Sequence, residues 1–370
     1  MKKITIHSVS LGLSALLLLV ILGLLFTGNI AHAGIPILIF FALLALGFSG
    51  YTSLSGYVFT TMIFAGVAMA LYYPQYFTQI GDFKLTALII PLIQVIMFGM
   101  GTSMSISDFA GIFKAPKGVL IGIVAQLGIM PFMGLALAKF SAFPPEIAAG
   151  IVLIGCSPSG VASNVMAYLA KANLALSITI TAVSTLLSPF VTPLLMKLLA
   201  GEFIEINVLD MMWTIVKMII IPIGAGLLFN KLRGEKAKWL DKAMPVVSML
   251  GIGLIITIIT AAGRNSLLEI GGILMLLVLV HNTFGYALGY WFGRLFKMTE
   301  SDARTIAIEV GMQNAGLASG IANSLGKIAT MGLAAAVFGP FMNITGSILA
   351  SYWHRKTPKD YVDIDTVEGK

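Results

Sequence analysis

The stretch "RTIAIEVGMQNAGLASGIA" (residues 304–322) places one carboxylate, Glu309, in a run of apolar and small residues. A run of about 20 such residues is long enough to cross the hydrocarbon core of a bilayer. An ionisable side chain at that depth is costly unless it faces a partner or water. If this stretch lies in a membrane, Glu309 therefore requires a cation or a proton.

The composition of the whole chain is that of a membrane protein. The chain has 370 residues, of which 58% are hydrophobic and 11% are charged, and its mean hydropathy is +0.96. Soluble domains carry roughly 25% charged residues. We expect about twelve spanning helices, at residues 8–27, 35–50, 56–74, 86–104, 117–139, 146–170, 173–197, 208–229, 243–262, 268–293, 305–325 and 329–352.

The basic residues predict which ends of the spans face the cytoplasm. Most Lys and Arg fall on one side of the predicted membrane, in segments 113–117, 230–242, 294–304 and 354–359. This bias predicts an even number of spans, both termini in the cytoplasm and a location in the plasma (inner) membrane. The net charge of +7 lies in short loops rather than on one folded surface, so it does not indicate a nucleic-acid partner.

The first 50 residues have two interpretations. "MKK", a long apolar run and "AHA" at 31–33 are also the features of a cleavable secretory signal. The apolar run is long for a signal peptide, which favours a pair of retained hydrophobic helices. The single cysteine, Cys156, lies inside a predicted span, so no internal disulfide is expected.

Two blocks of five predicted spans follow, at about 56–197 and 208–352. Two consecutive blocks with an odd number of spans enter the membrane from opposite sides, as an inverted repeat requires. The fourth span of each block is interrupted by small and helix-breaking residues, in "GCSPSGVASN" (155–164) and "EVGMQNAGLASG" (309–320). We therefore predict an all-α polytopic membrane protein with two inverted five-helix repeats and two broken helices.

The first break contains Pro158, which cannot donate a helical hydrogen bond, between Gly155 and Gly160. Freed backbone groups need partners in hydrocarbon, so the break is expected in a protein-lined cavity. The alternative is a proline kink in a continuous helix whose small residues serve only close packing. Corresponding breaks in both blocks favour the cavity.

Oxygen-bearing side chains gather around the two breaks and on nearby spans: Glu309, Gln313, Ser163, Asn164, Ser177, Thr181 and Gln126. Ser177 and Thr181 are four residues apart and share a helix face. Glu309 and Gln313 share one as well if their helix continues that far. Oxygen ligands with a single carboxylate suit a hard monovalent cation, and there is no Cys/His cluster for zinc and too few acids for calcium. Sodium fits best.

Each of these side chains also has a structural interpretation. Ser and Thr in membrane helices commonly bond their own backbone, and Gln126 can join two helices. Glu309 is alternatively a proton carrier or an ion-pair partner of Lys217, which interrupts the apolar run "WTIVKMIII" (213–221).

The breaks, their spacing and the stretches "ASNVMAYLAKANLALSITITAVSTLLSPFVTPLL" (162–195) and "EVGMQNAGLA" (309–318) resemble the bile acid:sodium symporter family, over about residues 56–352. Bacterial members include pantoate and other organic-anion sodium symporters. The resemblance implies ten spanning helices in two domains that move against each other. A panel domain would comprise 56–104 and 208–262, and a core domain with the two crossing broken helices 108–197 and 268–352. Residues 1–50 would be additional helices, and 353–370 a cytoplasmic tail.

The resemblance also implies two sodium sites and a substrate site. The first sodium site would use the side chains of Ser163, Asn164, Ser177, Thr181 and Glu309. The second would share Glu309 and add Gln126, Gln313 and the backbone carbonyls of Val310 and Met312. Positions that contact the substrate match Val161, Ala162, Asn314 and Ala315. Glu309 would then bridge two Na⁺ ions.

The implied function is sodium-coupled symport of a small organic anion across the lipid bilayer. Members of the family carry sterol conjugates in animals, and smaller acids such as pantoate or keto acids in bacteria and plastids. The first break departs from the family pattern "PGGTASN", because "PSGVASN" (158–164) has Val161 in place of a threonine and Ser159 in place of a glycine. This departure bears on the substrate rather than on the sodium ligands.

Three other functions fit parts of the sequence. A proton-coupled organic anion transporter would use Glu309 without sodium. An intramembrane serine hydrolase would pair a serine of "SPSG" (157–160) with His281. A passive channel would lack coupling altogether. Symport is the interpretation that uses both breaks, and we expect no enzyme activity; the sequence predicts no oligomeric state.

Overall fold

The computed structural model describes residues 5–51, 54–105, 115–233 and 239–361, and this part of the chain is almost entirely α-helical. The only strands within it are β1 (Gln79–Ile80) and β2 (Phe83–Lys84), which form a short antiparallel hairpin. Parts of the predicted basic loops (113–114 and 234–238), the initial "MKK" and the tail beyond residue 361 lie outside the described residues.

The longer helices, in chain order, are α1 (Ile6–Phe26), α2 (Gly34–Ser49), α3 (Val58–Tyr72), α5 (Ile89–Ser103), α8 (Pro116–Ser141), α9 (Pro145–Cys156), α10 (Ala162–Leu169), α11 (Leu174–Ala200), α12 (Val208–Ile215), α13 (Ile221–Arg233), α14 (Trp239–Ala262), α15 (Arg264–Leu295), α16 (Glu300–Gly311), α17 (Ala315–Ser324) and α18 (Gly332–His354). The shorter ones are α4 (Gln75–Thr78), the 3₁₀ turns Ile30–Ala33, Ser55–Tyr57 and Leu85–Leu88, and a π-helical turn, Val216–Ile220, that joins α12 to α13.

The predicted class, an all-α polytopic membrane protein, is confirmed. Among the described residues, nine helical segments are long and apolar enough to cross a membrane. The remaining three predicted spans correspond to α3, which has 15 residues, and to two pairs of half-helices. Several boundaries differ from the prediction. For example, α15 begins at Arg264 rather than at 268. The helix α16 begins at Glu300 rather than at 305, because the Thr299 side chain caps its first turn.

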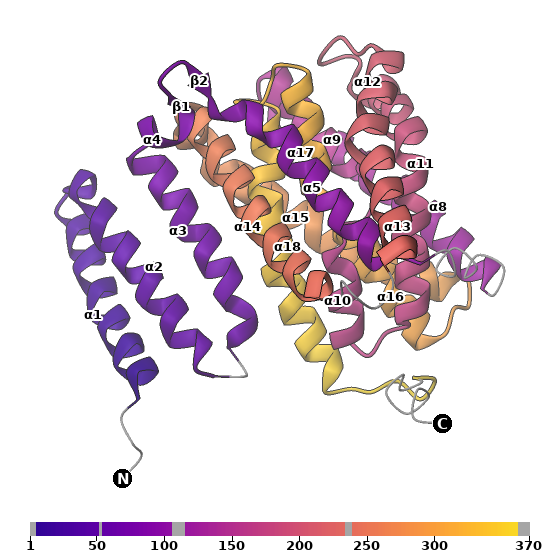
Figure 1. Cartoon of the computed structure of the whole chain (residues 1–370), viewed down its shortest axis with the longest axis horizontal. Coiled ribbons are helices and arrows are strands. Elements are labelled where there is room, and N and C mark those ends of the chain that lie inside the picture. The colour runs from indigo at the N-terminus through magenta and orange to yellow at the C-terminus, as the bar shows by residue number, and fades with distance from the viewer. Residues whose placement is uncertain (1–4, 52–53, 106–114, 234–238, 362–370) are drawn as a thin grey trace.

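The helices are arranged as a hairpin beside a larger bundle (Figure 1). The hairpin, α1 and α2, packs against α3 at one edge of the molecule, and α3 in turn packs against α14. The helices α5, α13 and α14 lie on one side of the bundle. The half-helices α9, α10, α16 and α17 lie among α8, α11, α15 and α18.

Small residues allow α5 and α13 to approach at backbone distance. A Cβ atom added to Gly101 would lie 2.3 Å from the carbonyl oxygen of Ile223, and one added to Gly226 would lie 2.3 Å from that of Phe98. Glycine at such contacts is typical of membrane helices, because association there depends on close packing. A side chain at either position would force these two helices apart.

Both predicted breaks are present, and they cross each other. The first separates α9 from α10 between Cys156 and Ala162, and the second separates α16 from α17 between Gly311 and Ala315. The two crossing segments pair through their backbones, since Gly160 N donates to Met312 O at 2.9 Å and Asn314 N donates to Pro158 O at 2.8 Å. The freed backbone groups thus find partners inside the protein, and a simple proline kink is excluded.

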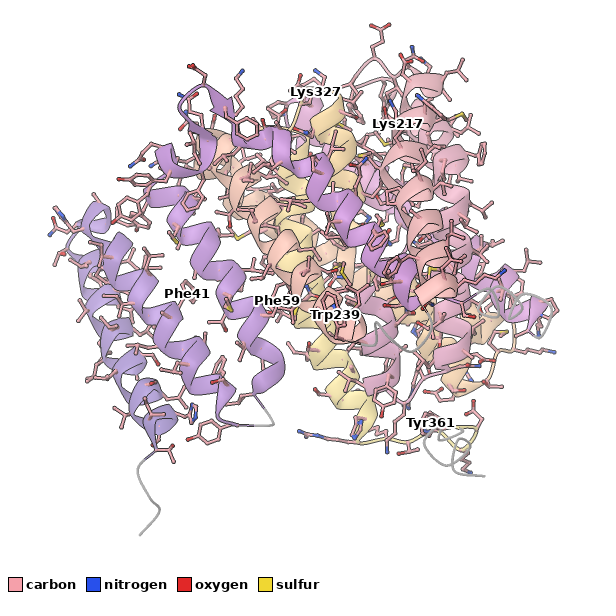
Figure 2. The ribbon with its side chains drawn as sticks, viewed as in Figure 1. Phe41, Phe59, Lys217, Trp239, Lys327 and Tyr361 are labelled. Carbon is pink, nitrogen blue, oxygen red and sulfur yellow. The ribbon has the colours of Figure 1, made fainter. Side chains whose placement is uncertain are left out.

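The ends of the half-helices are fastened by charged side chains. At the end of the molecule that carries the β1–β2 hairpin, Glu146 in the first turn of α9 accepts hydrogen bonds from Lys327 and Thr330, in the turn between α17 and α18. Figure 2 shows Lys327 at this end and Tyr361 at the opposite end.

At that opposite end Arg304 of α16, only 4% exposed, binds several segments. Its Nε donates to Glu300 at 2.9 Å, and its two Nη atoms donate to the carbonyls of Ala170, which follows α10, and of Trp353 and Lys356, at the end of α18 and beyond it. The segment that follows α18 is therefore held against the half-helices α10 and α16.

Candidate functional site

The centre of the candidate site is Glu309, which lies in the last turn of α16 and has no exposed surface. Its Oε1 accepts a hydrogen bond from Ser177 Oγ at 2.5 Å, and its Oε2 accepts one from Thr181 Oγ1 at 2.7 Å. Ser177 and Thr181 lie one turn apart on the continuous helix α11, as their spacing predicts. The carboxylate is therefore surrounded by hydroxyl groups rather than by a cationic side chain.

The half-helix α10, which follows the first break, completes this group of oxygens. Asn164 Oδ1, on α10, accepts from Ser177 Oγ at 2.9 Å and from Thr181 Oγ1 at 3.4 Å. Ser163 Oγ lies 3.2 Å from Thr181 Oγ1. All five residues predicted for the first sodium site thus lie together, and every side-chain atom that they direct at one another is an oxygen. One negative charge with neutral oxygens fits a hard monovalent cation.

A second polar group lies on the other side of the crossing. Gln126, from the middle of α8, donates from Nε2 to Gln313 Oε1 at 2.8 Å and to Ser157 O at 3.1 Å. Gln313 in turn donates from Nε2 to Val310 O at 2.6 Å. The Oε1 atom of Gln126 is buried and has no hydrogen-bond partner. An unpaired buried acceptor is unfavourable, and a cation beside it would remove that cost.

The condition under which Glu309 and Gln313 would share a helix face is not met. The helix ends at Gly311, so Gln313 is not one turn further along the same helix but lies in the break itself. Val310 belongs to the last turn of α16 and Met312 to the break, and the carbonyl of each already accepts a hydrogen bond, from Gln313 and from Gly160 N respectively. A carbonyl oxygen has a second lone pair, so these hydrogen bonds leave both carbonyls able to bind an ion.

Two buried residues that the sequence argument did not assign to the site support the crossing. Ser159 Oγ donates to the carbonyl of Glu309 at 2.6 Å. Asn282 Nδ2, on α15, donates to the carbonyl of Gly311 at 2.8 Å, and its Oδ1 accepts from Thr345. The only sequence feature that could have identified Asn282 is an amide side chain, next to His281, in an apolar span.

The four positions predicted to contact the substrate differ in their exposure. Val161 is 40% exposed and Ala162 is half-buried, whereas Asn314 and Ala315 are 6% and 9% exposed. The side chain of Asn314 caps α17, since its Oδ1 accepts from Leu317 N at 2.9 Å. Val161 is therefore the member of this set that presents the most surface to a ligand.

The face of α10 that includes this position is open. Val165, Tyr168 and Leu169 are 57%, 45% and 42% exposed, and with Val161 they follow one side of the helix. The half-helix α10 packs against α11, α16 and α18, whereas α17 packs against α18 and also against α5 and α12. This exposed face leads to the first break from the end of the molecule where the described chain ends.

The hypothesis of a serine hydrolase is wrong. Ser157 Oγ donates to Leu153 O at 2.9 Å, and Ser159 Oγ donates to the Glu309 carbonyl. The ring nitrogen Nε2 of His281 lies 3.0 Å from Met130 O, so neither serine pairs with this histidine.

The hypothesis of an ion pair between Lys217 and Glu309 is also wrong. Lys217 is exposed, with Nζ 5.7 Å from the centroid of the Trp213 ring, while Glu309 is fully buried. Within the described ranges, no group of three or more His, Cys, Asp or Glu side chains is placed to hold a metal ion.

The chain is similar in sequence to a known protein family and to several of its members. The model of the Sodium Bile acid symporter family matches residues 90–270. An uncharacterized sodium-dependent transporter of Bacillus subtilis, YocS, is 37% identical over 305 residues, which is 82% of this chain and 93% of that protein. A probable chloroplastic sodium/metabolite cotransporter of Arabidopsis thaliana is 31% identical over 269 residues, or 73% of this chain and 67% of that protein. A probable chloroplastic sodium/metabolite cotransporter of rice is 34% identical over 267 residues, or 71% and 63%.

Proposed function

This chain belongs to the Sodium Bile acid symporter family, and we propose that it couples the entry of sodium to the transport of a small organic anion. The relatives compared above are named as transporters, so the function sought is transport rather than catalysis. The observation that carries the proposal is the buried Glu309 carboxylate among the hydroxyl and amide oxygens of α10 and α11. A carboxylate inside a membrane protein needs a positive partner, and a sodium ion bound by these oxygens would be that partner.

Two ions per cycle are proposed. The oxygens of Ser163, Asn164, Ser177 and Thr181 would hold the first ion on one side of Glu309. The amides of Gln126 and Gln313 and the carbonyls of Val310 and Met312 would hold the second. The unpaired Oε1 of Gln126 supports the second site, because nothing else in the described part of the chain satisfies it.

The substrate is proposed to bind at the crossing, against Val161, Ala162, Asn314 and Ala315. Two half-helices, α10 and α17, begin at this point. The partial positive charge at these two helix N-termini favours a carboxylate. A pantoate- or keto-acid-like monoanion suits a site with so little exposed surface around Asn314 and Ala315.

We further propose that the protein lies in the plasma membrane. The end of the molecule that carries the tail and the open face of α10 would then face the cytoplasm. The helices α3, α5 and α12–α14 would form the panel, and α8–α11 with α15–α18 the core, related by an inverted repeat. Movement of the core against the panel would then expose the crossing to either side.

The experiment that tests sodium coupling is thermal unfolding of the purified protein in sodium or in potassium. We expect sodium to raise the melting temperature of the wild type, because a ligand at about 100 times its Kd stabilises by about 2.7 kcal/mol. We expect no such response in Glu309→Gln, which keeps the size of the side chain and removes its charge. Glu202→Gln is the matched control, because Glu202 is exposed and pairs only with Lys139 among the described residues.

Uptake into proteoliposomes then separates the remaining alternatives. A symporter requires a sodium gradient for uptake of carboxylates such as pantoate and pyruvate. Uptake that follows a pH gradient in the absence of sodium would instead establish the proton-coupled transporter, and uptake without any coupling would establish a channel.

A further inference from the structure

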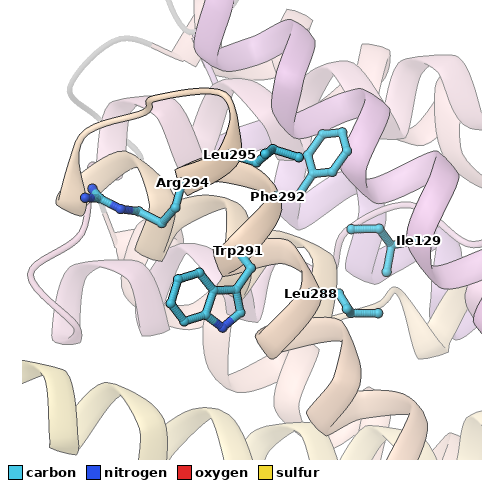
Figure 3. Close-up of a pocket in the computed structure, with 6 residues that line it drawn as sticks. All are labelled: Ile129, Leu288, Trp291, Phe292, Arg294 and Leu295. Atoms are coloured by element: carbon cyan, nitrogen blue, oxygen red, sulfur yellow. The ribbon is translucent and has the colours of Figure 1, made fainter.

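A groove lies on the outer surface of the bundle between α8 and α15 (Figure 3). Its volume is about 580 Å³, within the range of pockets that hold small ligands. Six of the described residues line it, and five of these are apolar: Ile129, Leu288, Trp291, Phe292, Arg294 and Leu295.

The apolar part of the groove runs along α15. Leu288 and Leu295 are seven residues apart, which corresponds to about 10 Å along a helix. Ile129, from the middle of α8, faces the Leu288 end, whereas Trp291 and Leu295 lie towards the end of α15. The groove thus extends from the interior of the membrane-spanning region to a helix end, where tryptophan is typical of the membrane–water interface.

Three cations lie at that helix end. Arg294 is in the last turn of α15, and Lys297 follows it. Lys117 is in the first turn of α8, next to Gly118, and a Cβ atom added to Gly118 would lie 3.2 Å from the side chain of Met298. The first turn of α8 and the turn after α15 are therefore neighbours.

Among the described residues, the acidic side chain that pairs with Arg294 is that of Glu300, which also binds other groups. Glu300 Oε2 lies 3.8 Å from Arg294 Nη1 and accepts a hydrogen bond from Tyr290, while Oε1 accepts one from Arg304 at 2.9 Å. The Arg294 side chain is 42% exposed, and Nη1 donates to Met298 O at 3.1 Å. Since Arg304 balances Glu300, the cations Arg294, Lys297 and Lys117 give the described residues at this end of the groove an excess of positive charge.

We propose that the groove binds a glycerophospholipid with an anionic head group. One acyl chain lies along Ile129 and Leu288, and the phosphate pairs with Arg294 beside Lys117 and Lys297. A water-soluble anion would leave the five apolar lining residues unused, whereas a lipid uses both parts of the groove. Basic pockets between spanning helices recognise anionic lipid head groups in this way. This site is separate from the sodium and substrate sites, so it stands whether or not sodium coupling is upheld.

The test measures binding of defined lipids to the purified full chain in a neutral detergent, by native mass spectrometry and thermal unfolding. Phosphatidylglycerol and phosphatidylcholine with identical acyl chains are compared, and glycerol 3-phosphate serves as a head group without chains. We expect preferential binding of phosphatidylglycerol. We expect about fivefold weaker binding for each cation removed, in Arg294→Gln and in Lys297→Gln. Lys84→Gln, an exposed lysine on β2 at the opposite end of the molecule (Figure 1), is the control and should bind as the wild type does.

A second variant tests the apolar part of the site. Leu288→Trp fills the groove without changing any charge, and we expect it to weaken binding of phosphatidylglycerol as well. Equal binding of the two phospholipids, or wild-type binding by both Arg294→Gln and Leu288→Trp, would overturn the proposal. Stabilisation by glycerol 3-phosphate equal to that by phosphatidylglycerol would overturn it too, in favour of a water-soluble anion.

Discussion

Ser177 Oγ lies 2.5 Å from Glu309 Oε1, although the two residues are 132 positions apart in the chain. This hydrogen bond joins α11, a continuous helix, to the end of α16, a half-helix. Both atoms are fully buried. Binding of an ion at the proposed first site is thus linked to the position of the second break. A substitution in the pair Ser177 and Glu309 is therefore the most direct test of that site.

Ser177→Ala should weaken sodium binding, because it removes one neutral oxygen from the proposed first site. The loss of one such contact is worth about 1 kcal/mol, so we expect the sodium concentration for half-maximal stabilisation to rise by about fivefold. Ser188→Ala is the matched control on the same helix, since Ser188 Oγ is buried and donates only to Thr185 O. An equal change in both variants would show that the effect is on folding rather than on the ion.

Gln313→Ala should abolish the proposed second ion site while leaving the first intact. Two coupled ions give a sodium titration with a Hill coefficient between 1 and about 2. We expect the coefficient to fall to about 1 in this variant, with sodium still stabilising the protein. A wild-type slope in Gln313→Ala would argue that Gln126 and Gln313 only join α8 to the crossing.

Much of this arrangement followed from the sequence, because lipid imposes strict rules on what can span a membrane. Apolar runs of the right length gave the helices, and polar atoms inside such runs, as at Ser177 and Thr181, identified the side chains that gather around Glu309. The breaks were visible because Pro158 and the flanking glycines cannot continue a helix in hydrocarbon.

The remaining features depend on contacts between distant segments. The partner of Ser159 is a carbonyl 150 residues away, which no local pattern encodes. Whether Gln313 shares a helix face with Glu309 could not be settled from the sequence, because it depends on the residue at which α16 ends; that residue is Gly311, and Asn314 caps the next half-helix. The groove beside Arg294 was not predicted either, since it exists only where α8 and α15 lie side by side.

Ser159→Ala should destabilise the crossing of the two breaks. The hydroxyl is the side-chain donor to the Glu309 carbonyl, and a buried carbonyl that loses its partner costs about 1–3 kcal/mol. We expect a lower melting temperature both with and without sodium. Ser319→Ala, whose buried hydroxyl only bonds the carbonyl of Ala315 in its own helix, provides the comparison. If the two variants melted alike, the Ser159 hydrogen bond would contribute nothing particular to the crossing.

The segment after α18 should stay bound to α16 across physiological pH. Burial disfavours the charged form of Asp360, but hydrogen bonds from Ser301 and Thr299 outweigh this and lower its pKa to about 2. A carboxyl whose pKa is lower in the folded protein stabilises it fully above about pH 4 and loses that effect as the pH falls through 2. We expect digestion of the C-terminus by a carboxypeptidase to stop before this segment equally at pH 5 and pH 8, and to proceed further in Asp360→Asn.

One outcome would contradict the role given to Asp360. If digestion of the wild type extended further at pH 5 than at pH 8, the hydrogen bonds of Asp360 would not be what holds this segment against α16.

Arg304→Gln should be the most destabilising of these substitutions. The guanidinium is buried and holds α16 to the end of α10 and to the segment beyond α18, so its loss removes a donor to Glu300 Oε1 and to the carbonyls of Ala170, Trp353 and Lys356. Removing one partner of a buried charged pair costs about 3–5 kcal/mol. Arg304→Lys keeps the charge but not the several directed donors, and should recover only part of the stability. Because α16 also carries Glu309, sodium should recover part of the lost stability in Arg304→Gln by favouring the bound arrangement of that helix. A melting temperature close to that of the wild type in potassium would mean that the helices hold this end together without Arg304.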